Sequence, residues 1–502
     1  MRVLLVATYE LGHQPTALAG PSARLRRAGH EVACLDLSIE PLETGAVDWA
    51  DKVAVSVPMH TAMRLARQVV ATVRSRRPEV PVCYYGLYAL TAAEPDGEGG
   101  AGGGLGPGDA AIAGEVEPDL EAWVEGRTAG VSRRLARVPD RPSDRSGLAA
   151  LERYARLVDE RGEHLVGAVE ASRGCSHRCR HCPVPVVYEG RVRPVEVADV
   201  LADVDQLVDA GAAHLTFADP DFLNAPRHAR RVVAAVHRRH PSLTFDCTVK
   251  VEHVLRHAGL WPELAAAGCR FVVSAFESTN DRLLALLRKG HTVEEASAAV
   301  ALLRRHGIEM RPSWLPFTPW TSAGDVADLV DFVLAHDLVA NVDPVQYSVR
   351  LLVPPGSLLL DDPELAAAFG SFDVAHLGYT WEHPDPSVDA LQRELAALVE
   401  DRAADPAEEV FGAVEALVRA AAGRGAGSVA GSRSAGPPGC RPRLTETWFC
   451  CSEPTAAQLA PVALVTGTPL AVGPGPGPVA SAPGSAAAAG AGATPVTWGP
   501  AR

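Results

Sequence analysis

One short stretch, residues 172–183 with the sequence SRGCSHRCRHCP, constrains this chain more than any other. Its three cysteines, Cys175, Cys179 and Cys182, have the spacing C-x-x-x-C-x-x-C and follow an apolar run at 165–169 that is typical of a buried strand. Each iron of a 4Fe-4S cluster takes an outer thiolate. Three cysteines on one loop leave one iron open to a chelating small molecule, which indicates chemistry rather than electron storage.

The same three thiols also suit a structural zinc site, because His177 or His181 offers a fourth ligand. The strand that precedes the loop and the βα series that follows it favour the cluster. The remaining cysteines in apolar strand-like runs are expected to act as small buried hydrophobes; they are Cys34, Cys83, Cys247 and Cys269.

Length and charge exclude several classes of function. With 502 residues, 47% of them hydrophobic, the chain has room for more than one domain. A net charge of −14 gives no general attraction to nucleic acid or to anionic membranes. The start of the chain enters a strand-like run without a cleavable signal, and no apolar segment is long enough to span a bilayer. We therefore expect a cytoplasmic protein with no membrane partner and no indication of a nucleic-acid partner.

The first 95 residues alternate strand and helix patterns, which predicts an open parallel sheet of the Rossmann type. Ligands on such sheets bind beyond the carboxyl ends of the strands, here near residues 9–15, 56–60 and 86–89. The predicted strands are 2–7, 29–36 (beginning with a turn), 52–57 and 80–85, and the predicted helices are 16–28 and 61–76.

Residues 163–360 repeat the strand-then-helix pattern six times, which predicts a partial (β/α)6 barrel with active residues on the loops after its strands. The cysteine loop follows the first of these strands, where such a site is expected. The predicted strands are 165–170, 213–218, 243–249, 270–276, 308–315 and 345–352.

Several motifs resemble the radical S-adenosylmethionine (SAM) enzymes. Residues 4–6 (LLV), 25–32 (LRRAGHEV) and 111–117 (AIAGEVE) are similar to the cobalamin-binding-type domain that precedes many of these enzymes, although no Asp-x-His-x-x-Gly motif occurs. The second half resembles the radical SAM core. There, residues 215–222 (LTFADPDF) match the segment that meets the methionine amino group, with Ala218-Asp219-Pro220 in place of the usual Gly-Gly-Glu, and residues 276–278 (FES) match the cobalamin-associated subset.

This resemblance implies an enzyme that uses a 4Fe-4S cluster to cleave SAM reductively and generates a 5'-deoxyadenosyl radical for the modification of an unidentified substrate. It implies Cys175, Cys179 and Cys182 as metal ligands and Asp219, Glu277 and Ser278 as cofactor-binding residues. Cobalamin is a candidate third cofactor, with cobalamin-assisted methylation as the corresponding reaction, and the electron donor is expected to be of the flavodoxin or ferredoxin type. The alternative is a non-catalytic iron-sulfur or zinc redox-sensing module.

Individual residues also have structural interpretations. Glu277 could cap the helix expected near Asp281, and Asp219 and Asp221 could be turn residues around Pro220. The histidines outside the cysteine loop are more often surface or packing residues than ligands; those considered are His13, His60 and His291.

A second pair of thiols, Cys450 and Cys451, lies beyond a Gly, Ser and Pro-rich segment. One interpretation is a small docking patch and the other is a redox pair. The sequence Cys-Cys-Ser-Glu-Pro is similar to the tail of the CUAEP/CCAEP-tail radical SAM family, which implies a catalytic role for both cysteines. We expect this arm either to relay hydrogen atoms or electrons or to hold a sulfur-bound intermediate.

The complete prediction is an α/β chain of seven parts. They are a cobalamin-binding-like domain at 1–126 with a glycine-rich loop at 95–108, a linker at 127–162, the radical SAM core at 163–360, a helical accessory region at 361–422, a disordered linker at 423–441, the Cys-Cys-Ser-Glu-Pro motif at 442–456 and a disordered tail at 457–502.

Overall fold

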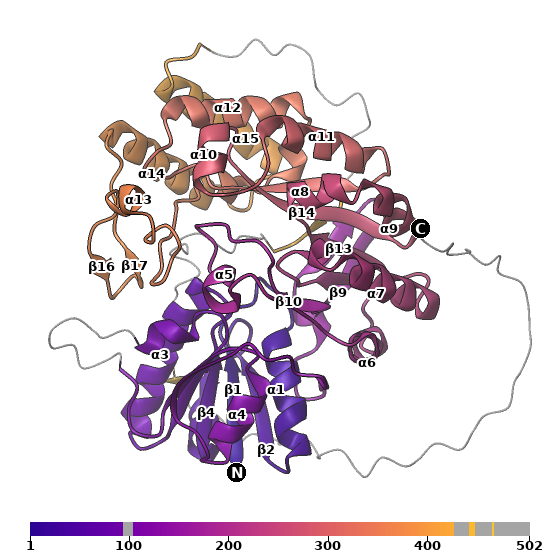
Figure 1. Ribbon diagram of the computed structural model, residues 1–502, viewed down its shortest axis with the longest axis vertical. Coiled ribbons are helices and arrows are strands. Elements are labelled where there is room, and N and C mark those ends of the chain that lie inside the picture. Colours follow the sequence, from indigo (N-terminus) through magenta and orange to yellow (C-terminus); the bar gives the residue numbers. More distant parts are fainter. Residues whose placement is uncertain (94–103, 426–440, 447–463, 466–502) are drawn as a thin grey trace, which may run out of the picture. The chain divides into compact units, whose positions relative to one another are not determined.

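The computed structural model describes residues 1–93, 104–425, 441–446 and 464–465 (Figure 1). All of these residues belong to one compact unit, Met1–Val472. The predicted cysteine pair at 450–451 lies outside the described residues. Within the segment predicted as a disordered tail, β19 (Leu464–Val465) pairs in parallel with β3 (Leu42–Glu43). No helix among the described residues combines the length and the apolar character needed to cross a membrane.

The N-terminal part is built on a six-stranded sheet in the order β2-β1-β4-β5-β6-β7, in which all neighbouring strands are parallel. Its central strands, such as β1 and β4, read as nearly continuous apolar runs because both faces of the sheet are covered there. This confirms the predicted Rossmann-like sheet. The strands are β1 (Arg2–Ala7), β2 (Glu31–Asp36), β4 (Lys52–Ser56), β5 (Val82–Tyr85), β6 (Ala110–Gly114) and β7 (Gly130–Arg134).

Helices cover the two faces of this sheet in separate groups (Figure 1). Alternate residues of β1 show the division, since Val3 and Leu5 pack with α1 (Thr16–Arg27) and α4 (Glu117–Val124). Leu4 and Val6 belong to the opposite core, which includes apolar residues of α2 (Thr44–Trp49) and α3 (His60–Arg76).

The second sheet has the order β15-β14-β13-β12-β9-β8-β18. Its five strands from β9 to β15 are parallel, while β8 and β18 add antiparallel strands at one edge. This arrangement confirms a partial barrel. The strands are β8 (Arg156–Asp159), β9 (Gly162–Val169), β12 (His214–Phe217), β13 (Thr244–Thr248), β14 (Cys269–Glu277), β15 (Glu309–Trp314) and β18 (Arg443–Leu444).

The predicted sixth barrel strand at 345–352 was wrong. A 3-10 turn occupies Pro344–Tyr347, and past this turn Arg350 makes an isolated parallel bridge to Phe317. Proline has no N–H and a fixed φ, which favours the start of a turn over a central strand. The barrel is therefore more open at this edge than the sequence predicts.

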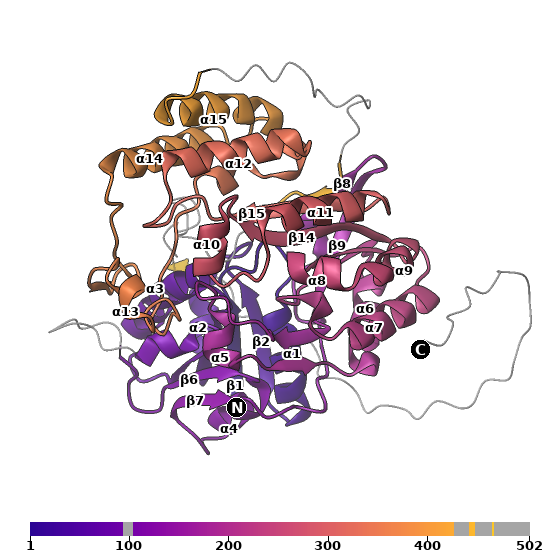
Figure 2. The ribbon, with the colours of Figure 1, turned by 45° about the horizontal axis from the view of Figure 1, so that its top comes forward.

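Helices connect the barrel strands and form an adjoining group. Two of them, α11 and α12, begin at capping boxes, Thr292 with Glu295 and Ser322 with Asp325. Both ribbon views show α12, α14 and α15 side by side (Figures 1 and 2). The helices are α5 (Val184–Tyr188), α6 (Val197–Asp209), α7 (Pro226–Arg239), α8 (Val251–Arg256), α9 (Trp261–Ala266), α10 (Asp281–Leu286), α11 (Val293–Arg304), α12 (Ala323–Ala335), α13 (Pro363–Ala366), α14 (Pro386–Asp401) and α15 (Ala407–Ala421), with a small hairpin of β16 (Phe372–Asp373) and β17 (Gly378–Tyr379) between α13 and α14.

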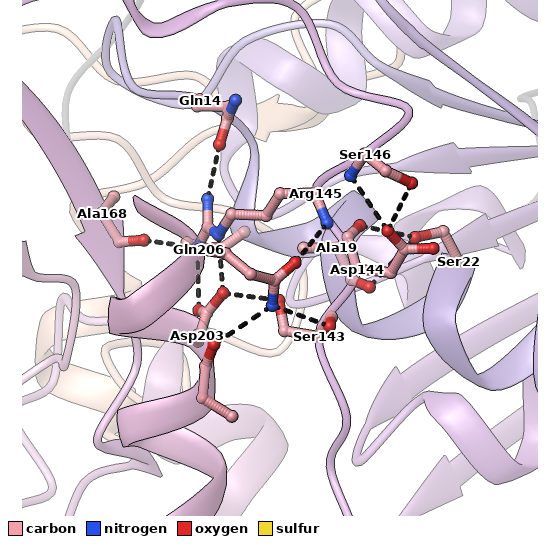
Figure 3. Close-up of polar contacts among 12 residues, drawn as sticks. Gln14, Ala19, Ser22, Ser143, Asp144, Arg145, Ser146, Ala168, Asp203 and Gln206 are labelled. Atoms are coloured by element: carbon pink, nitrogen blue, oxygen red, sulfur yellow. Dashed lines mark hydrogen bonds and ion pairs between the residues drawn. The ribbon is translucent and has the colours of Figure 1, made fainter. Parts of the chain in front are cut away.

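The segment predicted as a linker, 127–162, is structured at both ends. Its first part forms β7, which extends the N-terminal sheet past residue 126, and its last part forms β8 and the start of β9 in the second sheet. Between them lies the buried Arg145, whose Nε and Nη2 donate to the two carboxylate oxygens of Asp203 on α6 at 2.6 and 2.8 Å (Figure 3).

Arg145 also donates to Gln14 Oε1, in the N-terminal part, and to the carbonyl oxygen of Ala168 on β9, each at 2.7 Å (Figure 3). A buried guanidinium is tolerated only when its donors are satisfied. Through these four contacts, the segment predicted as a linker connects the loop after β1 to β9 and α6.

Candidate active site

A cavity of about 330 Å³ is lined by loops of both sheets. Some of the lining residues follow the carboxyl ends of β1, β4, β5 and β12, where ligands bind in α/β folds, and others lie within the barrel strands. This volume lies within the range of small-molecule sites. The cavity is therefore the candidate active site.

The cysteine loop forms one wall of this cavity. It follows β10 (Ser172–Gly174), which pairs antiparallel with β11 (Val192–Pro194), and all three loop cysteines line the cavity. Gly174, directly before the first cysteine, has φ +75°, and a Cβ there would overlap the carbonyl oxygen of Arg191. Glycine is therefore required at the point where the chain turns from β10 into the loop.

None of the three loop cysteines is in a disulfide. Cys175 and Cys179 are buried and Cys182 is half-buried. Burial, together with the nearby carboxylate of Asp221, raises the pKa of Cys175 to about 12. A thiol with such a pKa ionises when a metal binds it, and this donor set fits three corners of an iron-sulfur cluster.

Glu277 lies at the end of β14 and faces the same cavity. Its Oε1 accepts from Lys289 Nζ and lies against His181 Nε2, each at 3.0 Å. Burial alone would raise the pKa of this carboxyl, but Lys289 and His181 outweigh burial and lower it. Glu277 is thus a buried carboxylate tied to the cysteine loop through His181. The cap of α10 is Asn280, so the interpretation of Glu277 as that cap was wrong.

Asp219 lies after β12, is buried and also lines the cavity. Its Oδ2 accepts from the backbone N–H of Ala171 at 2.9 Å, and its Oδ1 accepts from the hydroxyl of Ser172. Burial raises the pKa of Asp219 to about 7 in spite of these donors. Asp219 therefore fixes the start of β10, two residues before Gly174. Asp221 instead caps a 3-10 turn through Leu223 N, which confirms its interpretation as a turn residue.

The N-terminal part supplies a mainly apolar wall opposite these charges. Its loops contribute residues from the three segments expected to hold ligands, 9–15, 56–60 and 86–89. Glu10 is the acid on this wall: its Oε2 accepts from Thr16 N at 2.9 Å, while its Oε1 is buried without a hydrogen-bond partner. Burial raises the pKa of Glu10 to about 8. The other lining residues of this wall are Leu11, His13, Thr16, Pro58, Met59, Leu87 and Tyr88.

A segment from near the C-terminus completes the lining. The strand β18 pairs with β8, and Thr445 N donates to Arg156 O at 2.9 Å. The next residue, Glu446, lines the cavity and accepts from Tyr9 Oη at 2.8 Å. The sequence did not predict the strand β18. It has two residues and pairs with a strand almost 290 residues away, so no local sequence pattern indicates it.

Several residues considered in the sequence lie elsewhere or make other contacts. Ser278 is not among the residues that line the cavity, and its Oγ accepts from Asn280 N at 3.1 Å. His60 is buried with its Nε2 2.7 Å from the carbonyl oxygen of His376, and His291 is buried beside Phe276. Both are packing residues, as expected, whereas His13 is buried on the cavity wall. Cys83, Cys247 and Cys269 are buried and Cys34 is half-buried, in line with their prediction as apolar residues.

Comparison with known proteins identifies the second part of the chain. The sequence model of the radical SAM superfamily matches residues 169–315, which include the cysteine loop and strands β12 to β15. The chain carries a radical SAM domain. Such a domain implies a 4Fe-4S cluster and SAM as cofactors, and it indicates an enzyme. The alternative of a non-catalytic sensing module gains no support.

Curated relatives match this radical SAM domain and its surroundings. The tRNA-2-methylthio-N(6)-dimethylallyladenosine synthase of Chlorobium chlorochromatii is 26% identical over 167 residues, 30% of this chain and 35% of the relative. The enzyme of the same name from Pasteurella multocida is 27% identical over 235 residues, 43% of this chain and 46% of the relative. The chain therefore spans less than half the length of these relatives.

Solved structures extend the similarity of fold beyond the radical SAM domain. The methyltransferase TsrM from Kitasatospora setae, with cobalamin and a [4Fe-4S] cluster bound, has a TM-score of 0.51 at 21% identity and covers 67% of this chain and 73% of its own. The cobalamin-dependent radical enzyme OxsB, with aqua-cobalamin and SAM bound, has a TM-score of 0.55 at 14% identity and covers 80% of this chain and 67% of its own. At these identities the likeness shows a shared fold.

Proposed function

We propose that this chain is a radical SAM enzyme whose 4Fe-4S cluster is held by Cys175, Cys179 and Cys182 and whose SAM lies in the cavity. The observation that carries this proposal is that the three cysteines of one loop all line the cavity. The cluster, when bound, supplies the electron for reductive cleavage of SAM to methionine and a 5'-deoxyadenosyl radical.

The residues around the loop then have separate tasks in this proposal. Asp219 and Glu277 are the cofactor-binding candidates that line the cavity, and Asp219 also orients the loop through its bonds to residues 171 and 172. Lys289 keeps Glu277 ionised beside the thiols. The apolar wall of the N-terminal part excludes water from the site, which protects a reactive radical from side reactions.

Anaerobic reconstitution followed by a 5'-deoxyadenosine assay tests this proposal. With dithionite as reductant, the wild-type protein should bind iron and release 5'-deoxyadenosine, and variants carrying Cys175→Ala, Cys179→Ala or Cys182→Ala should lose both properties. Cys34→Ala, in a half-buried position on β2, is the matched control and should retain them. Bound iron with SAM left intact would contradict the proposal.

The natural electron donor is proposed to be a flavodoxin or a ferredoxin in the cytoplasm, where the thiols stay reduced. Replacing dithionite by each reduced protein in the same assay tests this choice. A rate no greater than that without any donor would contradict it.

A second candidate is cobalamin-assisted methylation. Its support is the apolar wall that faces the cysteine loop across the cavity, together with a fold shared with structures whose titles name cobalamin. Among the lining residues of this wall, His13 carries the one imidazole. We therefore propose that Met59, Leu87 and Tyr88 contact a face of the corrinoid by packing. Protein purified with cobalamin present should then show corrinoid absorbance at about one equivalent per chain. If no corrinoid is retained, the apolar wall is assigned to the substrate.

The catalytic role predicted for Cys450 and Cys451 remains part of the proposal. The anchor at β18 puts Glu446 in the cavity wall, and Cys450 follows it by four residues in the sequence. Four residues of extended chain span at most about 14 Å, and this short connection to Glu446 supports the proposed role. Cys450→Ser and Cys451→Ser should each lower turnover of the substrate without changing the iron content. Full turnover by both variants would remove the role.

A further inference from the structure

Three metal-ligating side chains meet beside the cysteine loop, outside the cavity lining. His177 comes from the loop itself, between Cys175 and Cys179, Asp221 follows β12, and His253 lies on α8. One ligand atom of each side chain lies within 4.8 Å of the ligand atoms of the other two. Three elements that are distant in the sequence therefore bring two imidazoles and one carboxylate to a single point.

The separations within this group suit a shared cation. His177 Nε2 is 3.2 Å from His253 Nε2 and 3.8 Å from Asp221 Oδ2, and His253 Nδ1 is 2.8 Å from Asp221 Oδ2. Nitrogen and oxygen ligands lie about 2.0–2.2 Å from a bound zinc ion, which puts neighbouring ligand atoms about 3–3.5 Å apart. An imidazole binds a metal ion through one nitrogen, and for His253 the nitrogen next to Asp221 is Nδ1. With one ligand atom from each side chain, all three lie within 4.8 Å of one another, so side-chain movement is needed to complete the site.

The closest pair, His253 and Asp221, is in contact without forming a hydrogen bond. His253 Nδ1 and Asp221 Oδ2 are both buried, and neither has a hydrogen-bond partner despite their separation of 2.8 Å. An N–H group that donates to an oxygen points at it, whereas two ligands of one metal point at the metal between them. Two unsatisfied buried polar atoms are costly, and a cation would satisfy both.

The cations nearest to this group are already paired with other carboxylates. Lys289 is bound to Glu277 at 3.0 Å, and Lys250 Nζ lies 3.7 Å from Glu252 Oε2. Arg256 also pairs with Glu252. Glu252 Oε2 also lies 3.6 Å from His177 Nδ1, so two carboxylates face the imidazoles, and Asp221 is the one with a buried oxygen that has no hydrogen-bond partner.

We infer that His177, Asp221 and His253 form a second metal site that binds a divalent transition-metal ion, of which zinc is the probe. Two imidazoles and one carboxylate are a donor set that proteins use for zinc and for ferrous iron. The site joins the cysteine loop to the segment after β12 and to α8. Asn224 makes a parallel connection, since its Oδ1 accepts from Ser176 N at 3.1 Å and from Ser176 Oγ at 2.7 Å.

Metal analysis of the cluster-reconstituted protein tests this inference. The protein is equilibrated with zinc sulfate, exchanged into metal-free buffer, and its iron and zinc are measured by inductively coupled plasma mass spectrometry. Wild-type protein should retain about one zinc per chain in addition to the cluster iron. His253→Ala and the nearly isosteric Asp221→Asn should each lower the retained zinc at least about tenfold while the iron content stays unchanged.

A neighbouring histidine provides the matched control. His257 lies four residues after His253, at the end of α8, with ring centroids 5.5 Å apart, and His257→Ala should retain both metals. Zinc X-ray absorption should show only nitrogen and oxygen ligands. Sulfur ligands at about 2.3 Å would place the zinc on the loop cysteines and overturn the inference. Equal zinc in wild type and His253→Ala, or iron lost together with zinc in both variants, would also overturn it. The iron content tests the proposed cluster separately, so the two proposals can fail independently.

Discussion

Two acids on facing walls of the cavity, Glu10 and Glu277, have pKa values shifted in opposite directions. On the N-terminal wall, Glu10 has a buried oxygen without a partner, and burial raises its pKa to about 8. On the barrel wall, Glu277 is buried, but Lys289 and His181 lower its pKa. Asp219, on the barrel side without such a cation, has a pKa raised by burial like that of Glu10. Burial therefore favours the neutral acid, and a buried cation at hydrogen-bond distance reverses the effect.

Replacing Lys289, the cation that pairs with Glu277, should have the largest effect on this contrast. Lys289→Met leaves Glu277 buried with His181 as its remaining partner, and the free energy of unfolding should fall by about 3–5 kcal/mol. Urea denaturation measures this loss. Arg288→Met, at the exposed neighbouring position, should cost less than about 0.5 kcal/mol. Equal stability of the two variants would show that the ion pair between Lys289 and Glu277 does not contribute to the free energy of unfolding.

The N-terminal wall should respond to a loss of packing rather than of charge. Met59→Ala removes a buried side chain from the cavity lining and should lower the free energy of unfolding by about 2 kcal/mol. The iron content after reconstitution should stay at the wild-type level, because Met59 belongs to the opposite wall from the cysteine loop. Loss of iron in this variant would contradict the division of the two walls.

The unpaired acid of the N-terminal wall should make stability depend on pH. Because the pKa of Glu10 is raised from about 4.3 to about 8, the folded protein keeps a proton that the unfolded chain has lost between these values. Stability is therefore highest below about pH 4.3 for this group and falls as pH rises towards 8, by at most about 1.4 kcal/mol per pH unit.

Glu10→Gln removes this titration without changing the size of the side chain, so packing effects are kept to a minimum. Urea denaturation between pH 5 and pH 8.5 should give a flatter stability profile for the variant than for wild type. Parallel profiles would show that Glu10 is ionised in the folded protein.

The smallest effect is expected at Ser278, next to Glu277 but turned away from the cavity. Ser278→Ala removes the bond to Asn280 N and should cost about 1 kcal/mol or less in the free energy of unfolding. The apparent affinity for SAM, measured by 5'-deoxyadenosine formation against SAM concentration, should not change. A weaker affinity would restore the cofactor-binding role that the sequence resemblance implies.

The sequence predicted the order of strands and helices well because parallel strands covered on both faces, such as 3–6, read as unbroken apolar runs. It also predicted the cysteine loop and the carboxyl-end segments, since these follow directly from strand ends. It failed at the sixth barrel strand, where Pro344, directly before the predicted strand, begins a 3-10 turn that extends to Tyr347.

What the sequence could not predict depends on partners far apart in the chain. The role of Glu277 changes from cap to ion pair because Lys289, twelve residues later, reaches its carboxylate. Arg145 lies in a segment that reads as a plain linker, and its burial depends on Asp203 and Gln14. No local periodicity records such pairings.

The antiparallel strand β18 has a consequence for the edge of the second sheet. It occupies the open side of β8, whose backbone N–H and C=O groups would otherwise face solvent. An unpaired strand edge is a template for association with another chain. A protein shortened before Arg441 would expose this edge, so we expect it to aggregate although its predicted domains are all present. By covering the edge of β8, Arg443 and Leu444 thus protect the protein against self-association.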